Sequence, residues 1–272
     1  MAKLGILAGG GELPALLIQS CRQRGRDFHV LALKGQADGG AIAAAPHDWI
    51  RLGDYGQTLG RMRQLGISEV VFCGKVSRPP LGDLLIDWRT AWFLARIGGR
   101  LISDNRLLVA IVKEFESRGF TVIGVADVEP SLLAREGPYG REVPTEAERR
   151  SIAIGFAAAR AVGRRDQGQA AVVQGDDVLD VEGADGTDAL ITRSADRQRG
   201  GRGAILVKAR KPQQEMRSDP PVVGIATVQN AAAARFRGIA IEPGGAIVLN
   251  GAALGAAADA AGMFLIGAGA AE

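Results

Sequence analysis

Residues 4–14 read Leu4-Gly5-Ile6-Leu7-Ala8-Gly9-Gly10-Gly11-Glu12-Leu13-Pro14, and the fold can be inferred from this segment. The apolar run before the glycines predicts a buried strand, and the helical spacing of the residues that follow predicts a helix. Glycines at such a junction let a phosphate approach the backbone, where amide groups and the helix dipole favour anions. The segment therefore predicts a parallel α/β domain with an anion site after its first strand.

The rest of the first half continues this alternation of short apolar runs and helical-period segments. The pattern predicts strands at 3–8, 28–33, 69–73 and 120–125, and helices at about 13–24, 57–66, 81–97 and 104–118. Strands that alternate with helices are typical of a parallel sheet. We expect an N-terminal Rossmann-like domain over residues 1–130.

The second half begins with a change of composition. Residues 131–144 lie in a stretch rich in Pro, Glu and Gly, which predicts a linker or long surface loop. Thr145 and Glu148 then have the spacing of a capping box for a helix over about 146–163. Beyond it we predict strands near 169–173, 177–182, 204–208, 222–225, 238–242 and 246–249, with helices near 186–199 and 251–261. The first two strands are expected to form a hairpin in a C-terminal α/β or α+β domain over residues 145–272.

Composition narrows the class of ligand. The chain has 272 residues, a formal net charge of +3 and 5% aromatic residues. This length is sufficient to bury a stable core. The small charge and the few aromatic side chains argue against a nucleic-acid-binding protein, whereas a modestly basic site for a small anionic molecule fits.

The cysteines, the histidines and the N-terminus argue against a secreted protein, a membrane-spanning protein and a zinc or Ser-His enzyme. Cys21 and Cys73 lack a CxxC spacing and lie in apolar surroundings, so we expect reduced, buried thiols in a cytoplasmic protein. A strand begins at once and no window reaches about 18 apolar residues, so neither a leader nor a membrane span is expected. His29 and His47 are the two histidines, and their positions argue against a zinc site or a Ser-His pair.

The first candidate anion site is the loop of Gly9, Gly10, Gly11 and Glu12. Its spacing is not the dinucleotide fingerprint, because Pro14 stands at the place of the third glycine. A phosphate-loop Lys-Ser/Thr pair is absent as well, which argues against both NAD and ATP. A nucleotide or another phosphate remains the predicted ligand, with a purely structural turn as the alternative.

The other candidates of the first half follow predicted elements. Lys75 stands at the carboxyl end of a predicted parallel strand, where ligands bind in open α/β sheets, and it could reach a diphosphate. It could equally be an exposed loop cation. Asp104 and Asn105 either cap the helix that begins there or contact the ligand.

Residues 205–228 form a strand-like run, a loop dense in opposite charges and a second apolar run. The loop region contains four cations and two carboxylates: Lys208, Arg210, Lys211, Arg217, Glu215 and Asp219. Such cations hold phosphate oxygens, and a carboxylate beside them binds a metal or orders a water. A solvated surface turn is the alternative.

Further carboxylates follow the predicted hairpin. Glu182, Asp185 and Asp188, together with Asp219, could form an oxygen-only site for Mg²⁺ or Mn²⁺. Thr187 and Asp188 could instead cap a helix within a solvated acidic turn. Without a suitable histidine, hydrolysis would depend on carboxylates, cations and metal. Asp219 would then coordinate the metal or orient the attacking water, while lysines offset charge on the phosphoryl oxygens.

Taken together, these motifs resemble those of one family, the LpxI-type UDP-2,3-diacylglucosamine pyrophosphatases of lipid A biosynthesis. The resemblance covers nearly the whole chain. Besides residues 4–14, it is carried by Ser103-Asp104-Asn105, Gly168-Gln169-Ala170-Ala171-Val172-Val173, Val181-Glu182, Gly186-Thr187-Asp188-Ala189, Val207-Lys208, Lys211-Pro212 and Arg217-Ser218-Asp219-Pro220.

The resemblance implies a two-domain enzyme that hydrolyses UDP-2,3-diacylglucosamine to 2,3-diacylglucosamine 1-phosphate (lipid X) and UMP, with Mg²⁺ and attack of water on the phosphorus nearer the sugar. Asp219 falls on the family's essential aspartate. The matching positions imply catalytic roles for Asp219, Lys208 and Lys211, metal ligation by Asp219, Glu182 and Asp188, and substrate contacts from Gln169, Thr187, Asp188 and Arg217. The chain departs from the family at Gln213-Gln214-Glu215, where Gly-Gln-Asp is expected, and at Pro220, where Leu is usual.

The implied partner is a lipid-linked sugar nucleotide. The run over 84–94 could line a groove for its acyl chains or touch the surface of the inner membrane, with an ordinary core helix as the alternative. A homodimer is a further expectation. Two other functions stay open: a non-catalytic sugar-nucleotide-binding or regulatory protein of the same fold, and a transferase that uses the same anion sites.

Overall fold

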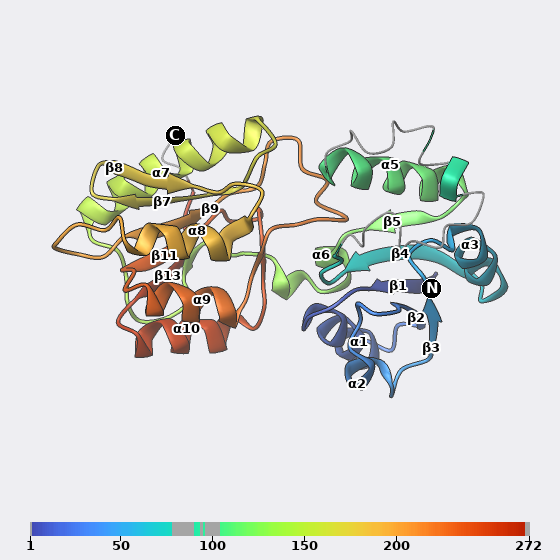
Figure 1. Cartoon of the computed structure of the whole chain (residues 1–272). Helices are drawn as coiled ribbons and strands as arrows, with labels where there is room; N and C mark the ends of the chain where they lie inside the picture. Colours follow the sequence, from blue (N-terminus) through green and yellow to red (C-terminus); the bar gives the residue numbers. More distant parts are fainter. Residues whose placement is uncertain (1, 78–89, 93–94, 96–103, 270–272) are drawn as a thin grey trace. The chain divides into compact units, whose positions relative to one another are not determined.

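The computed structural model describes residues 2–77, 90–92, 95 and 104–269 (Figure 1). The chain divides into two compact units. The N-terminal unit consists of Met1–Pro130 and Glu215–Asp219, and the C-terminal unit of Ser131–Gln214 and Pro220–Glu272. Each unit has its own sheet and its own apolar core.

The N-terminal unit is built on a five-stranded parallel sheet in the order β3-β2-β1-β4-β5. Its strands are β1 (Lys3–Ala8), β2 (Phe28–Leu33), β3 (His47–Ile50), β4 (Ile67–Cys73) and β5 (Thr121–Ile123). This order matches the first five strands of the doubly wound Rossmann order 3-2-1-4-5-6, which confirms the predicted N-terminal fold. The two central strands β1 and β2 are almost continuously apolar because helices cover both faces of the sheet.

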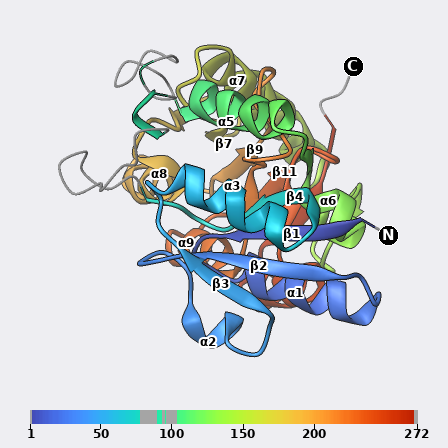
Figure 2. The ribbon, with the colours of Figure 1, turned by 90° about the vertical axis from the view of Figure 1, so that its right-hand side faces the viewer.

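Helices α3 and α5 cover one face of this sheet, and α1 and α2 the other (Figure 2). The helices are α1 (Leu13–Gln23), α2 (Gly39–Ile42), α3 (Tyr55–Gln64), α5 (Asp104–Ser117) and the short α6 (Val125–Val128). Under α3 and α5 the core contains Met62, Val112 and Phe115, packed against strand residues such as Leu31 and Val70. This packing fixes which side of α5 faces solvent.

The C-terminal unit contains a six-stranded mixed sheet in the order β6-β13-β11-β9-β7-β8 and a small pair, β10 with β12. The bounds are β6 (Gly137–Pro138), β7 (Ala170–Gln174), β8 (Asp177–Val181), β9 (Ile205–Lys208), β10 (Val222–Val223), β11 (Gly238–Ile241), β12 (Ile247–Val248) and β13 (Phe264–Gly267). The predicted hairpin is confirmed, since β7 and β8 pair antiparallel.

Four helices cover this second sheet: α7 (Glu146–Arg164), α8 (Gly186–Ala195), α9 (Ile225–Ala233) and α10 (Gly251–Ala260). Helix α7 lies on one face, where Phe156 packs against Val173 and Val207. Helices α8, α9 and α10 lie on the other, where Leu190 and Leu206 belong to a separate core. The alternation of side chains along each strand supplies both cores from the same sheet.

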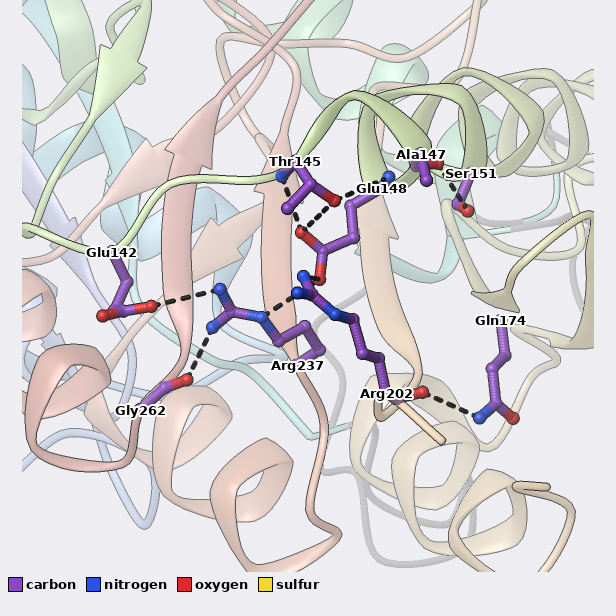
Figure 3. A network of polar contacts seen from close by, with 9 residues as sticks. All are labelled: Glu142, Thr145, Ala147, Glu148, Ser151, Gln174, Arg202, Arg237 and Gly262. Atoms are coloured by element: carbon purple, nitrogen blue, oxygen red, sulfur yellow. Dashed lines mark hydrogen bonds and ion pairs between the residues drawn. The ribbon is translucent and has the colours of Figure 1, made fainter. Parts of the chain in front are cut away.

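The predicted capping box of α7 is confirmed and extends into a larger ion network (Figure 3). The Thr145 N–H donates to Glu148 Oε2 at 2.6 Å, while Glu148 Oε1 accepts from Arg202 at 3.1 Å and from Arg237 at 3.0 Å. Burial raises the pKa of Glu148, but hydrogen bonds from Thr145 and Arg202 outweigh it and hold the pKa below its ordinary value. Glu148 therefore joins the start of α7 to the chain before β9 and β11.

Several elements differ from the sequence prediction. The predicted strand over 120–125 ends at Ile123, because Asp127 accepts from the Gly124 N–H and α6 begins at Val125. Strands β3 and β13 and helix α9 were not predicted, and β6 lies in the stretch predicted as a linker, where it pairs with β13. The predicted helix over 81–97 lies mostly outside the described residues, as does most of the apolar run over 84–94. No helix in the described part of the chain combines the length and the apolar character needed to cross a membrane.

Candidate active site

The carboxyl edge of the N-terminal sheet brings two predicted anion loops together. From β1 the chain adds β2 and β3 on one side of the sheet, and then returns to add β4 and β5 on the other side. Open α/β sheets bind ligands at such a reversal of the strand order, which here lies between β1 and β4. Three backbone hydrogen bonds tie the loops: Gly9 N to Cys73 O, Gly10 N to Lys75 O and Lys75 N to Gly10 O, each at 2.8 Å. The structure thus places Lys75 beside the glycine loop.

Contact with backbone explains why glycine is needed in these loops. A Cβ atom on Gly9 would lie 2.4 Å from Lys75 O, and one on Gly10 would lie 2.8 Å from Gln36 O. Gly74 has a φ of +87°, and its Cβ would lie 2.6 Å from Gly10 O. The Gly9 and Gly10 amides both donate to backbone carbonyls, and contact of these glycines with a phosphate stays a prediction.

Gly11 differs from its two neighbours. It has a φ of +88°, and a Cβ atom there would meet nothing within 4 Å. Gly11 and Glu12 line a hollow of about 470 Å³ whose other walls come from α1, α2 and the residue before α2. Gly11 and Glu12 are therefore the residues of the predicted glycine site that face open space.

Gln36, which was not predicted as a site residue, holds the Lys75 loop from the side. Its Nε2 donates to Ser77 O at 3.2 Å, and its Oε1 accepts from Ser77 N at 3.0 Å. The side chain thereby pairs with the backbone as a neighbouring strand would. A glutamine after a strand gives no sequence signal for this role.

The segment Glu215–Asp219 belongs to the N-terminal unit and lies next to the end of β5. A Cβ atom on Gly124, the residue that follows β5, would lie 3.6 Å from Arg217 Cα. Arg217 donates to both oxygens of Glu215, at 2.9 and 2.8 Å, and to Glu116 Oε1 at 2.6 Å. The segment that ends at the exposed Asp219 therefore passes the carboxyl end of β5, the neighbour of β4 in the sheet.

Electrostatics in this segment is dominated by Arg217. The hydrogen bonds from its guanidinium hold the pKa of Glu215 below the ordinary value, although partial burial opposes them. The hydrogen bond with Glu215 likewise raises the pKa of Arg217. Arg217 Nε, Nη1 and Nη2 all donate to carboxylates, and its contact with substrate stays a prediction. The side chains of Asp104 and Asn105 are outside the described residues, and their backbone begins α5.

In the C-terminal unit, four predicted site residues form one chain of hydrogen bonds, in which Lys208 and Glu182 are buried and Thr187 and Gln169 partly buried. Lys208 ends β9 and is 4% exposed, and its Nζ donates to Thr187 Oγ1 at 3.0 Å and to Val222 O at 3.3 Å. The Thr187 hydroxyl donates to Glu182 Oε1 at 2.6 Å, and Glu182 Oε2 accepts from the Gln169 N–H at 2.6 Å. The order of donors is fixed because an ammonium can only donate.

Most of the carboxylates of the predicted metal site are engaged in hydrogen bonds or ion pairs within the protein. Both oxygens of the buried Glu182 already accept hydrogen bonds, Asp188 Oδ1 accepts from Asn230 at 2.9 Å, and Asp185 forms an ion pair with Arg193. In the part of the chain that the structure describes, no three His, Cys, Asp or Glu side chains gather closely enough to hold a metal ion. Metal ligation by Glu182 and Asp188 therefore stays a prediction.

Lys211 lies in a second polar cluster of the same unit. Its Nζ donates to Asp166 Oδ1 at 2.8 Å, and its N–H donates to Gln214 Oε1 at 2.9 Å. Gln214 Nε2 in turn donates to Gln169 Oε1 at 3.1 Å. Gln169 thus connects this cluster with the Lys208 chain. Asp166 and Gln214 were not predicted, because hydrogen bonds across 45 residues leave no local signal.

Comparison with known proteins places both halves of the chain in one family. The family model described as the LpxI N-terminal domain matches residues 3–132, and the LpxI C-terminal domain model matches residues 135–266. The chain is 37% identical, over 274 residues, to the UDP-2,3-diacylglucosamine pyrophosphatase LpxI of Caulobacter vibrioides. That alignment covers 98% of this chain and 98% of the relative.

Proposed function

Because the chain belongs to the LpxI family, we propose that it is a hydrolase that cleaves the pyrophosphate bond of UDP-2,3-diacylglucosamine, a reaction of lipid A biosynthesis. The products are 2,3-diacylglucosamine 1-phosphate (lipid X) and UMP. The observation that carries this proposal is the 37% identity, over 98% of both chains, to a relative with this named activity. The family resemblance seen in the sequence motifs is confirmed by the same comparison.

The N-terminal unit supports a role in binding the nucleotide and its diphosphate. The strand order of its sheet reverses between β1 and β4, and open α/β sheets bind ligands at the carboxyl edge beside such a reversal. We assign ligand contact to Gly11, Glu12 and Lys75, because Gly11 and Glu12 line the hollow and the backbone of Lys75 is hydrogen-bonded to Gly10, the residue before them. Gly9 and Gly10 would shape this loop rather than donate to phosphate.

Asp219 is the proposed catalytic carboxylate. It is exposed, and the segment to which it belongs passes the end of β5, the strand beside β4, while Lys75 lies just after β4. Asp219 would hold Mg²⁺, or Mn²⁺ in its place, together with phosphate oxygens, since Mg²⁺ in phosphoryl-transfer sites commonly uses one or two carboxylates and the substrate. When bound, such an ion would neutralise charge on the diphosphate. Asp219 would also orient the water that attacks the phosphorus nearer the sugar, with UMP as the leaving group.

Lys208 is the proposed electrostatic stabiliser. A buried ammonium is costly unless it is paired and hydrogen-bonded, and Thr187 and Glu182 provide that support. A fixed positive charge in a site from which water is largely excluded stabilises negative charge that develops on phosphoryl oxygens. Lys211 is proposed to contribute in the same way, and Gln169, Thr187 and Asp188 to contact the substrate.

The cysteines and the proposed substrate indicate where in the cell the protein would act. The free, buried Cys21 and Cys73 support a reducing, cytoplasmic location. A substrate with two acyl chains would be met at a membrane surface, so we propose peripheral contact with the inner membrane. Vesicle flotation with and without UDP-2,3-diacylglucosamine tests this, and a protein that stays unbound in both cases would contradict it.

The activity is tested by incubating the purified protein with UDP-2,3-diacylglucosamine and Mg²⁺ in ¹⁸O-labelled water. We expect UMP release, with the label in lipid X because water attacks the phosphorus nearer the sugar. Label in UMP would contradict the proposed site of attack. Tight substrate binding without UMP would contradict hydrolysis and favour the non-catalytic binding protein, while transfer to another acceptor would favour a transferase.

A further inference from the structure

The five residues Glu215–Asp219 group with the N-terminal unit, although the residues before and after them belong to the C-terminal unit. The short segment that ends at Asp219 therefore makes more of its contacts with the N-terminal unit. The contact at Gly124 fixes where Arg217 passes the end of β5. The segment is held against α5 by the ion pair of Arg217 with Glu116.

Glu116 and Glu215 hold the Arg217 guanidinium from two sides. Arg217 Nη1 donates to Glu116 Oε1 at 2.6 Å, while Nε and Nη2 donate to Glu215 Oε1 and Oε2 at 2.9 and 2.8 Å. Glu116 lies in the last turn of α5, and the buried Val112 and Phe115 determine how this helix is oriented. Glu116 thus anchors Arg217 to a rigid element.

The backbone of the segment passes this anchoring on to Asp219. The N–H groups of Ser218 and Asp219 donate to Glu215 O at 3.1 and 3.0 Å, and the Arg217 N–H donates to Glu215 Oε1 at 3.2 Å. Glu215 is therefore bonded through both its side chain and its carbonyl. A change in the direction of Arg217 would move Glu215, and with it the turn that ends at Asp219.

We propose that Glu116 is a positioning residue, which acts through Arg217 and Glu215 to set the place of the Asp219 carboxylate; this rests on the proposed role of Asp219 in hydrolysis. Side chains of Glu116 and Arg217 are 40% and 39% exposed, so their ion pair contributes little to global stability. A displacement of a reacting group by about 1 Å, in contrast, can cost roughly a hundredfold in rate. The effect should appear in turnover and in local order, and little in folding.

Hydrogen exchange tests the anchoring without any assay of activity. Glu116→Gln removes the charge of the anchor, and Lys113→Gln is the matched control, because Lys113 is exposed on the same helix. We expect the amides of Ser218 and Asp219 to exchange about fivefold faster in Glu116→Gln, the scale of an exposed ion pair, and unchanged in the control. Unchanged exchange in Glu116→Gln would overturn the proposal, whether or not the protein hydrolyses the substrate.

Kinetics tests the consequence for the reaction. Glu116→Gln is expected to lower kcat about fivefold or more and to change KM by less than about twofold. Because Glu116 acts through Arg217, the double variant Glu116→Gln/Arg217→Gln should be no slower than Arg217→Gln alone. A kcat equal to that of the unaltered protein, or fully additive losses, would overturn the proposal. If the unaltered protein itself released no UMP, the proposed function would fail, while the exchange experiment would still decide the anchoring.

Discussion

Lys208 and Glu182 are two buried charges joined through one hydroxyl, that of Thr187. Lys208 Nζ donates to Thr187 Oγ1 at 3.0 Å, and the same hydroxyl donates to Glu182 Oε1 at 2.6 Å. Lys208 is 4% exposed and Glu182 is 5% exposed. The hydroxyl therefore separates the charges and still satisfies both, which holds the ammonium in one direction.

Loss of the ammonium should slow the reaction strongly. Lys208→Ala is expected to reduce kcat/KM by about 10²-fold or more, the usual scale for an electrostatic stabiliser. The control is Arg165→Ala, which removes an exposed cation after α7 in the same unit and should leave kcat/KM within about twofold. A kcat/KM that is unchanged in Lys208→Ala would remove Lys208 from the mechanism.

Loss of the bridging hydroxyl should affect both stability and turnover. Thr187→Val keeps the shape but leaves Lys208 and Glu182 without their shared partner, so we expect a loss of about 1–3 kcal/mol in the free energy of unfolding. Thr187→Ser retains the hydroxyl and should keep most of the stability and of kcat. Denaturant unfolding and UMP release measure the two effects. Equal behaviour of the valine and serine variants would show that the hydroxyl is unimportant.

Substitution of Gly74 by alanine should destabilise the protein more than the same substitution at Gly119, because only Gly74 is in close contact with backbone. Gly74 and Gly119 have φ values of +87° and +89°, but only the former would place a Cβ against backbone, 2.6 Å from Gly10 O. Gly119→Ala should cost roughly 1 kcal/mol for the left-handed conformation. Gly74→Ala should cost about 2 kcal/mol more, because the loops at the sheet edge must separate. Similar unfolding free energies for both variants would contradict the tight loop contact.

Glu148 should make folding stability dependent on acid pH. Its pKa is lower in the folded state than in the unfolded state, so its contribution is fully present above the unfolded pKa and is lost as the pH falls through the folded pKa. Glu148→Gln leaves Arg237 without its main buried partner and should cost about 3 kcal/mol at pH 7. Measured in denaturant from pH 7 to pH 3, the difference between the two proteins should shrink. A difference that stays constant over this range would contradict the lowered pKa.

The local patterns allowed much of the fold to be predicted. The apolar strand before Gly9, the Thr145 capping box and the hairpin that ends at Glu182 each depend on residues close together in sequence, and the structure contains all three. Strand β3 was missed because its sequence His47-Asp48-Trp49-Ile50 is short and half polar. Helix α9 was missed because its apolar start merges with the strand before Gly224.

The site could be predicted only in part. Residue type made Lys208, Thr187 and Glu182 candidates, but the sequence could not reveal that they form one hydrogen-bonded chain with Gln169. Likewise, nothing local indicates that the Gly9 and Gly10 amides donate to carbonyls of a loop more than 60 residues away. Arg217 and Glu116 are 101 residues apart, so their ion pair is visible only in the folded chain.

The central claim is that Asp219 acts at the reacting phosphate, and Asp219→Ala tests it most directly. UMP release and equilibrium binding of UDP-2,3-diacylglucosamine should be measured on the same preparation, with circular dichroism as the check on folding. We expect turnover to fall to background while the fold and substrate binding are retained, because one small group at the reacting centre is removed. UMP release at close to the rate of the unaltered protein would contradict the account.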